Sequence, residues 1–253
     1  MDLYAFPPIA AILDLAYTGL MSLVSLLQPL VGVSAAAAAV VLVSLIVRAA
    51  LIPAGIAQAR AEQTRARLAP KLRELQKRHR KDPERLQRET MQLYRDENAS
   101  PFAGCLPILV QAPIVGVLYA VFLHALIDGH PNELLTGTLL SVPLGSSLAG
   151  ALAAASPDAG TLLVFGALVL LIATVGEATR RLFRPTTASE DSALRRAPVG
   201  LLGLLQFATA VVAIFVPLAA GLYLLVSVAW TLGQRIILRR VYPPPAVPDA
   251  APR

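Results

Sequence analysis

The sequence predicts an all-α polytopic membrane protein with a five-helix transmembrane core, a cytoplasmic helical hairpin and an N-terminal interfacial helix. Three observations support this fold class. Apolar residues form 56% of the 253 residues and charged residues only 15%, which lies outside the usual composition of soluble domains. Apolar runs long enough to cross a bilayer recur along the chain. Basic residues gather between those runs, as topology signals do.

The expected segments alternate between the two sides of the membrane. They are an outer N-terminal segment (1–32), a first span (33–56), a cytoplasmic hairpin (57–100), a second span (101–127), an outer loop (128–160), a third span (161–179), a cytoplasmic loop (180–197), a fourth span (198–216), a fifth span (217–238) and a cytoplasmic tail (239–253).

The N-terminal segment contains an apolar stretch, residues 9–27, with a polar stripe. The polar positions recur at helical spacing, which favours a helix lying in the membrane interface. A sixth span remains the alternative, because the uncharged N-terminus would break no charge rule on either side. The stripe consists of Asp14, Thr18, Ser22 and Ser25.

The distribution of basic residues fixes the expected orientation. Of the 22 Lys and Arg residues, 12 lie in residues 60–95, five in 180–196 and four from 235 onward, which leaves only Arg48. Five spans place all three basic segments on one side. Since basic loops stay in the cytoplasm, we expect an outside N-terminus and a cytoplasmic C-terminus.

Two apolar regions could each be assigned as a span or divided differently. Residues 134–155 contain Pro143 with several glycines and serines, and a span there would place the basic segment 180–196 outside, so we expect an outer loop. Residues 198–238 are about twice the length that a bilayer needs. We therefore expect the chain to reverse near Phe215–Pro217, where proline lacks the N–H that a continuing helix would use.

The segment 57–100 predicts two antiparallel helices. "KDPER" offers Asp82 as an N-cap and Pro83 at the first helical position, which is a restart signal. A sparse apolar stripe at helical spacing would pack one helix on the other. The stripe comprises Leu68, Leu72, Leu75, Leu86, Thr90 and Leu93.

The basic surface of this hairpin has two interpretations. It is either a solvated face made basic by the topology rule, or a docking surface for ribosomal RNA, anionic lipid or a targeting partner. The candidate docking residues are Arg73, Lys77, Arg78, Arg80, Lys81 and Arg85.

Arg48 lies about 15 residues into the first span, roughly 22 Å along a helix axis. Snorkelling of a long side chain to the interface is one explanation. The alternative is a wet cavity open to the cytoplasm, because polar residues also follow one face of the other spans. These groove candidates are Ser44, Gln58, Gln111, Thr174, Glu177, Gln206, Ser227, Thr231 and Gln234.

The sequence offers no motif for bond chemistry. It lacks a phosphate loop, a nucleophile elbow and a paired-carboxylate arrangement, and its three histidines are scattered. We therefore expect no enzyme activity, no cofactor and no metal site.

Four stretches carry a family resemblance. They are "VRAALIPAGIAQARAEQ" (47–63), "LAPKLRELQKRHRKDPERLQRETMQLYRDENASP" (68–101), "PFAGCLPILVQAPIVGVLYAVF" (101–122) and "VPLAAGLYLLVSVAWTLGQRIIL" (216–238). These stretches resemble the YidC family of membrane protein insertases.

The resemblance implies a groove closed to the outside and open to the cytoplasm and to lipid, in a multi-pass protein of the bacterial plasma membrane. Arg48 matches the family's groove arginine and Trp230 its aromatic residue at the lateral exit. Relatives often carry glutamine where this chain has Gly176 and Glu177, so Glu177 either pairs with Arg48 or faces the interface. The implied partners are nascent membrane proteins, the lipid bilayer, the ribosome and the Sec translocon, and the implied functional state is a monomer.

Two other functions fit the same features. A small transporter would bind an anionic solute at Arg48, although such folds commonly contain an internal repeat that this chain lacks. A scaffold for other membrane proteins would use the same surfaces without translocating anything.

Overall fold

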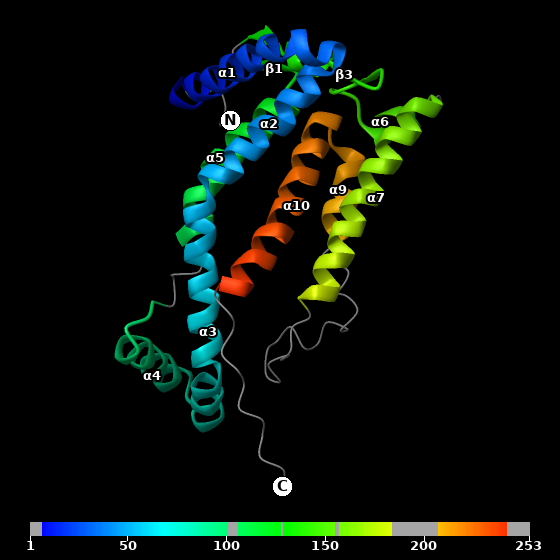
Figure 1. The fold of residues 1–253 in the computed structure, drawn as a ribbon. Coiled ribbons are helices and arrows are strands. Elements are labelled where there is room, and N and C mark those ends of the chain that lie inside the picture. The colour runs from blue at the N-terminus through cyan, green and yellow to red at the C-terminus, as the bar shows by residue number, and fades with distance from the viewer. Residues whose placement is uncertain (1–6, 101–105, 128, 155–156, 184–206, 242–253) are drawn as a thin grey trace. The chain divides into compact units, whose positions relative to one another are not determined.

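The structure is a computed structural model that describes residues 7–100, 106–127, 129–154, 157–183 and 207–241, most of which are helical (Figure 1). Contacts divide the chain into two compact units: Met1–Ala49 with Val115–Leu232, and Ala50–Ile114 with Gly233–Arg253. The elements are α1 (Pro7–Val31), η2 (Gly32–Ser34), α2 (Ala35–Ala50), α3 (Ile52–Arg78), α4 (Pro83–Asp96), α5 (Leu106–Leu123), β1 (Leu126–Ile127), β2 (His130–Pro131), η3 (Glu133–Thr136), β3 (Thr138–Leu139), β4 (Val142–Pro143), α6 (Leu148–Ala153), α7 (Ala159–Leu182), α9 (Ala208–Phe215) and α10 (Leu218–Val241).

Three helical stretches of the described chain are long and apolar enough to cross a membrane: Pro7–Ala50, Ala159–Leu182 and Leu218–Val241. Gln111–Leu123 forms a shorter apolar helix. The prediction of a helical protein with several candidate spans is confirmed to this extent.

Helix α1 presents three different faces. Leu13 and Leu20 are buried and face the core of the first unit, whereas Ile12 and Leu15 leave 52% and 73% of their surface exposed. The polar stripe predicted from the sequence is exposed as well, on a face of its own. Its members are Asp14, Thr18, Ser22 and Ser25.

The connection between α1 and α2 is a sharp turn. Gly32 has φ +58°, a conformation that glycine adopts without the steric cost that a Cβ would bring. The 3₁₀ turn η2 follows, and Figure 1 shows α1 lying across the direction of α2. The two helices therefore have separate directions although their apolar sequence is continuous.

The core of the first unit is made by α1, α2, α5, α7, α9 and α10 together with the loop between α5 and α7. On α2 the small residues Ala37 and Ala39 are almost completely buried. The Phe122 and Tyr223 rings lie 5.9 Å apart between centroids, which joins α5 to α10. A Cβ added at Gly221 would come within 2.6 Å of Leu168 Cδ2, so glycine permits the close packing of α10 on α7.

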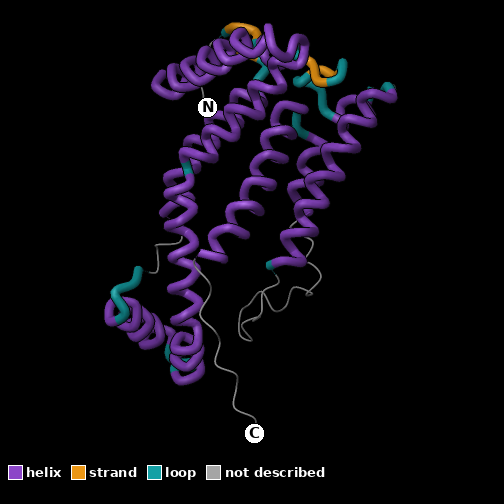
Figure 2. Tube along the Cα trace, in the orientation of Figure 1, coloured by secondary structure: helices purple, strands orange, loops and turns teal. Residues whose placement is uncertain are grey.

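The segment between α5 and α7, predicted as an outer loop, contains two short antiparallel strand pairs, β1 with β2 and β3 with β4 (Figure 2). Its backbone carries structural hydrogen bonds, since the carbonyls of Leu144 and Ser146 accept the N–H groups of Ala219 and Leu218 at 3.0 and 2.9 Å. These N–H groups belong to the first turn of α10, where no intrahelical acceptor exists. The loop therefore caps a candidate span.

The side chain of Asn132 caps the C-terminal end of α5 in a similar way. Its Nδ2 donates to the carbonyls of Val121 and His124 at 2.7 and 2.9 Å, and its Oδ1 accepts the N–H of Leu134. Asn132 is 4% exposed, so these bonds satisfy a buried amide. The sequence predicts an outer loop here, but it does not reveal this packing.

The first predicted span, residues 33–56, is divided in the structure. Helix α2 ends at Ala50, Leu51 is non-helical, and α3 begins at Ile52. Pro53 lies in the first turn of α3, where its missing N–H costs nothing. The segment predicted as the first span therefore consists of two helices that meet at Leu51.

The predicted break near Phe215–Pro217 is confirmed. Helix α9 ends at Phe215, and α10 starts at Leu218. Val216 is extended, with φ −87° and ψ 156°. Residues 198–206 of the predicted fourth span lie outside the described residues.

In the second unit, α3 and α4 pack on each other and are joined by residues 79–82. The Asp82 side chain accepts the N–H of Arg85 at 3.0 Å with Pro83 at the start of α4, so the predicted N-cap is confirmed. Leu68 is fully buried, and the other members of the predicted apolar stripe are partly buried. The pairing of these two helices therefore rests on the expected side chains.

Candidate functional site

Arg48 lies on the inward face of α2. Val40 and Ser44 are fully buried, and Arg48 follows Ser44 by one further helical turn. The Ser44 hydroxyl donates to the Val40 carbonyl at 2.6 Å, which satisfies it within the helix. The Arg48 side chain is half-buried, and among the described residues it forms no ion pair.

A second polar face belongs to α10. Tyr223 and Ser227 are 3% and 6% exposed, Trp230 is half-buried and Thr231 is exposed. Thr231 donates to the Ser227 carbonyl at 2.8 Å. The hydroxyl oxygens of Tyr223 and Ser227 are buried without a hydrogen-bond partner among the described residues. Buried hydroxyls of this kind ordinarily require a polar partner or ordered water.

The inward face of α2 and the polar face of α10 both become more exposed toward the C-terminal ends of their helices. Along α2 the series runs from buried Val40 and Ser44 to half-buried Arg48, and along α10 it runs from buried Ser227 to exposed Thr231. Figure 1 shows α2 and α10 running in the same direction. The inward surface of the first unit is therefore dry near the outer loop and more accessible near Arg48.

Helix α7 presents a different surface at Thr174 and Glu177. Its buried residues, Phe165, Leu168 and Ile172, define the inward face, whereas Thr174 and Glu177 lie on roughly the opposite side by helical spacing. Thr174 is exposed and donates to the Leu170 carbonyl at 2.7 Å. This placement gives no support to a groove position for either residue.

The carboxylate of Glu177 is engaged on its own helix. It accepts from Arg180 Nε and Nη2 at 2.6 and 2.7 Å and from Arg181 Nε at 2.6 Å. Of the two alternatives that the sequence left open, a pair with Arg48 and a place at the interface, the pairing with Arg48 is not present.

The remaining groove candidates belong to the second unit or are not described. Gln58, Gln111 and Gln234 lie in the second unit and are half-buried. Gln206 lies outside the described residues. The Gln234 side chain occupies the space where a Cβ at Gly55 would stand, so α3 and the end of α10 are in close contact.

An ion pair extends this α3–α10 contact. Arg235 Nη2 lies 3.4 Å from Glu62 Oε1, with both side chains largely exposed. Exposed pairs of this kind contribute about 0–1 kcal/mol, so this pair adds little to the contact.

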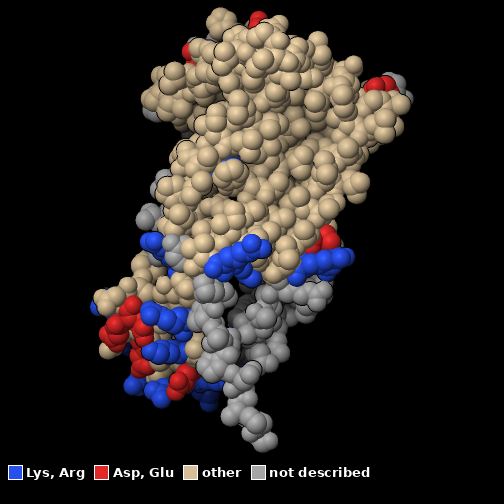
Figure 3. Space-filling view, in the orientation of Figure 1, with Lys and Arg blue, Asp and Glu red and all other residues tan. Residues whose placement is uncertain are grey.

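The predicted docking residues lie on the surface of the α3–α4 helix pair. All six are exposed, and Arg85 also holds Glu89 at 3.1 Å. Figure 3 shows basic and acidic side chains mixed over this pair, whereas the surface over α1 is almost uncharged. The docking candidates are Arg73, Lys77, Arg78, Arg80, Lys81 and Arg85.

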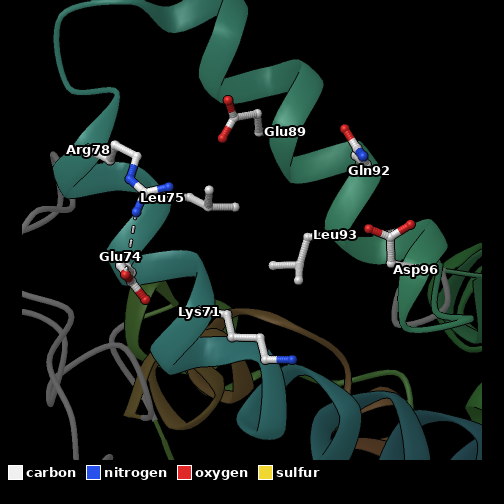
Figure 4. A pocket seen from close by; sticks show the side chains of 8 residues that line it. All are labelled: Lys71, Glu74, Leu75, Arg78, Glu89, Gln92, Leu93 and Asp96. Carbon is white, nitrogen blue, oxygen red and sulfur yellow. Dashed lines mark ion pairs between the residues drawn. The ribbon is translucent and has the colours of Figure 1, made fainter.

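A cavity of about 360 Å³ opens between α3 and α4 (Figure 4). Leu75 and Leu93 point toward each other across it, while charges of both signs form its rim. Arg78 lies 3.9 Å from Glu74, so part of the basic charge is already balanced. Of the docking candidates, Arg78 lines this cavity and the other five lie outside its lining, so the five remain the stronger candidates for an anionic partner. The lining is Lys71, Glu74, Leu75, Arg78, Glu89, Gln92, Leu93 and Asp96.

Two acidic groups of the helix pair have pKa values below the ordinary range. The hydrogen bond from Arg85 lowers the pKa of Glu89, and His79 Nε2 lies 2.9 Å from the same carboxylate. The hydrogen bond from Lys71 lowers the pKa of Glu97, and Arg67 lies 3.3 Å away. Glu97 thus ties the end of α4 back to α3.

Tyr223 is the residue of the α10 face that the sequence analysis missed. It lies one helical turn before Ser227, and with Thr231 it extends the polar spacing of that face. The signal was present in the sequence, but tyrosine is also a common core residue, and its buried hydroxyl is visible only in the fold.

Comparison with known proteins gives a consistent result. A model of the 60Kd inner membrane protein family matches residues 26–245. The membrane protein insertase YidC of Clostridium perfringens is 43% identical over 81 residues, which are 32% of this chain and 34% of that protein. The YidC of Oceanobacillus iheyensis is 38% identical over 112 residues, 43% of this chain and 42% of that protein. The matched segments thus span less than half of each relative.

Proposed function

This chain belongs to the YidC family, and from that premise we propose that it is a membrane protein insertase and chaperone for nascent membrane proteins. A nascent segment enters a hydrophilic groove that is open to the cytoplasm and to lipid. Arg48 attracts an acidic tail of the substrate, and the apolar segment then moves sideways into the bilayer. The reaction makes and breaks no covalent bond in the substrate.

One observation carries this proposal: the exposure of two polar faces increases toward the same end of the first unit. Arg48 stands half-buried on one face, and the buried hydroxyls of Tyr223 and Ser227 stand on the other. Two unsatisfied hydroxyls in the first unit, together with an arginine that has no ion pair among the described residues, favour a hydrated surface over a dry core. Water there shortens the apolar path that a polar tail has to cross.

The magnitudes of the two opposing effects are comparable. An acidic residue at the centre of a bilayer costs about 2.5–3.5 kcal/mol on insertion scales. An arginine 4 Å away attracts an anion by about 4 kcal/mol at an effective dielectric constant near 20. Arg48 can therefore hold an acidic tail partway across without trapping it.

The proposed architecture has five spans around the groove, in a multi-pass protein of the bacterial inner membrane. The N-terminus lies outside, and the charged helix pair and the C-terminus lie in the cytoplasm, because that orientation keeps the basic segments inside. Helix α1 lies in the outer interface. Its exposed apolar face, with Ile12 and Leu15, and its polar stripe suit lipid and headgroup respectively.

In the first unit, the groove is proposed to be lined by Ser44, Arg48, Ser227, Trp230 and Thr231, with Tyr223 added. Gln58, Gln111, Gln206 and Gln234 stay predictions from the sequence. We propose the ribosome and the Sec translocon as partners at the cytoplasmic face and a monomer as the working state. Thr174 and Glu177 are left out because they lie on the opposite side of α7 from its buried face.

Reconstitution tests this proposal. Liposomes containing only the purified protein should make single-span substrates resistant to added protease, and empty liposomes should not. A transporter would instead produce flux of an anionic solute, and a scaffold would bind the substrates without protecting them. Either of these results in place of protection would reject insertion as the activity.

A further inference from the structure

The outward surface of α7 carries a shallow depression of about 640 Å³ near its C-terminal end. Small or apolar side chains form most of it, and Phe207, next to α9, forms one wall. Arg181 and Glu177 are its charged members. The remaining lining residues are Ala173, Thr174 and Ala178.

Among the described residues, the guanidinium of Arg181 is hydrogen-bonded through its Nε atom. Its Nε donates to Glu177 Oε1 at 2.6 Å, and its side chain is 72% exposed. Among the described residues, the terminal Nη groups of Arg181 have no partner. Arg180, in contrast, uses both Nε and Nη2 on the same carboxylate. Glu177 thus orients Arg181 through Nε and does not itself engage the terminal donors that suit a phosphate.

An apolar track leads to this arginine. Leu163 and Leu170 are 72% and 67% exposed and precede Glu177 by two and one heptads, so they share its face of α7. The helix Ala159–Leu182 is one of the candidate spans, and Arg181 lies in its last turn. In a membrane, this face therefore meets acyl chains along its length and headgroups at Arg181.

We propose that this depression binds one anionic phospholipid. The phosphate lies on the Nη groups of Arg181, and an acyl chain lies over Ala178 and Phe207 and along Leu170. Basic pockets between spanning helices on the cytoplasmic side are suited to anionic headgroups. A free phosphate ion would use the arginine but leave the apolar depression uncovered, whereas a phospholipid matches both parts. This site lies on the opposite side of α7 from the groove and goes beyond the proposed insertase function.

Retention of lipid by the purified protein tests the site. The full chain is reconstituted in nanodiscs with equal amounts of phosphatidylglycerol and phosphatidylcholine, then released and analysed by native mass spectrometry. We expect a retained phosphatidylglycerol in the wild type. Arg181→Gln should lower its occupancy about fivefold, the factor for the roughly 1 kcal/mol that a basic residue contributes near an anionic surface.

Two further variants separate the site from general attraction. Arg240→Gln removes the same charge from the last turn of α10 and should leave the retained lipid in place. Ala178→Leu fills the depression and keeps every charge, so it should also lower retention. Equal loss in Arg240→Gln and Arg181→Gln would overturn the proposal, as would full retention in Arg181→Gln or Ala178→Leu.

A last arm identifies the source of the phosphate group. Displacement of the retained lipid by inorganic phosphate alone would show an anion site without a role for the acyl chain and would reject the lipid assignment. Protease protection of an inserted substrate is measured on the same preparations. A variant that loses lipid but still inserts would separate this site from the groove function.

Discussion

Ser44 and Arg48 lie one helical turn apart on the inward face of α2, and the surface changes from fully buried to half-buried between them. Ser44 closes its hydrogen bond within the helix, at 2.6 Å to the Val40 carbonyl. Arg48 has no such internal acceptor for its charge among the described residues. The inward surface of α2 therefore changes from apolar to polar between Ser44 and Arg48.

Replacing Arg48 should affect substrates according to their charge. We expect Arg48→Ala to reduce insertion of substrates with acidic outer tails by about tenfold, which is a fraction of the roughly 4 kcal/mol attraction available at 4 Å. Arg48→Lys should retain most activity, because the charge matters more than the guanidinium geometry. Protease protection in liposomes measures this, and neutral-tailed substrates are the control. Equal insertion of acidic tails by wild type and Arg48→Ala would remove the assigned role.

Loss of the Asp82 cap should loosen α4 alone. Asp82→Ala removes the acceptor for the Arg85 N–H and should destabilise the helix by about 1 kcal/mol. Hydrogen exchange of residues 83–96 in the full protein measures the effect. Asp96→Ala removes an equal charge from the other end of α4, where an acid is unfavourable, and should not accelerate exchange. Similar acceleration in both variants would argue against capping.

Acidification should weaken the α3–α4 pairing. The folded pKa values of Glu89 and Glu97 lie below the ordinary value of 4.5, so their ionised pairs stabilise the folded form at neutral pH. That contribution is present above pH 4.5 and is lost as the pH falls through the lower folded values. Hydrogen exchange of α4 at decreasing pH, corrected for intrinsic rates, should show this loss. Glu97→Gln should reduce the pH dependence, and an unchanged profile would contradict the assignment.

Two glycines should respond oppositely to alanine. A Cβ at Gly55 would overlap the terminal amide of Gln234, so Gly55→Ala forces this flexible side chain to move and should cost up to about 1 kcal/mol despite the better helix propensity of alanine. Gly166, within α7, has open space at its Cβ position, and Gly166→Ala should be neutral or stabilising by up to about 1 kcal/mol. Thermal unfolding in detergent compares them. Partial rescue of Gly55→Ala by Gln234→Ala would confirm the contact, and its absence would count against it.

The exposed basic residues of the helix pair should decide ribosome binding. Reversing Arg73, Lys77 and Arg80 to Glu should weaken co-sedimentation with ribosomes, and the wild-type interaction should fall steeply with salt. Reversing Glu74 and Glu84 to Lys on the same helix pair is the matched control and should not weaken it. Unchanged binding in the basic-residue variant would favour a solvated face whose charge only sets topology.

Local signals in the sequence were sufficient for several features of the fold. Asp82 with Pro83 predicted the start of α4, and Pro217 predicted the break before α10, because capping and proline geometry act within a few residues. The buried stripe of the helix pair followed from its spacing. The division of the first span at Leu51 was missed because hydropathy continues unchanged through residues 47–56, although Pro53 was in view.

Features that depend on distant segments could not be predicted in this way. The role of Asn132 at the end of α5 requires the loop to fold back over many residues. Glu177 had three possible arginine partners: Arg48 and two arginines on its own helix. Arg180 and Arg181 are favoured because they lie within about one helical turn of Glu177. For the groove, the spacing of polar residues did not reveal which way their helix faces point. Thr174 was therefore included among the candidates and Tyr223 was not.

The two backbone bonds from Leu144 and Ser146 to the start of α10 have a practical consequence for labelling. An epitope or fluorophore inserted between residues 142 and 147 would pull on the final helix, and a failed insertion assay would then report damage by the tag. The turn at Gly129 is exposed, with open space around it, and can accept such a tag. A reporter placed there would report on this loop while the anchored end of α10 stays undisturbed.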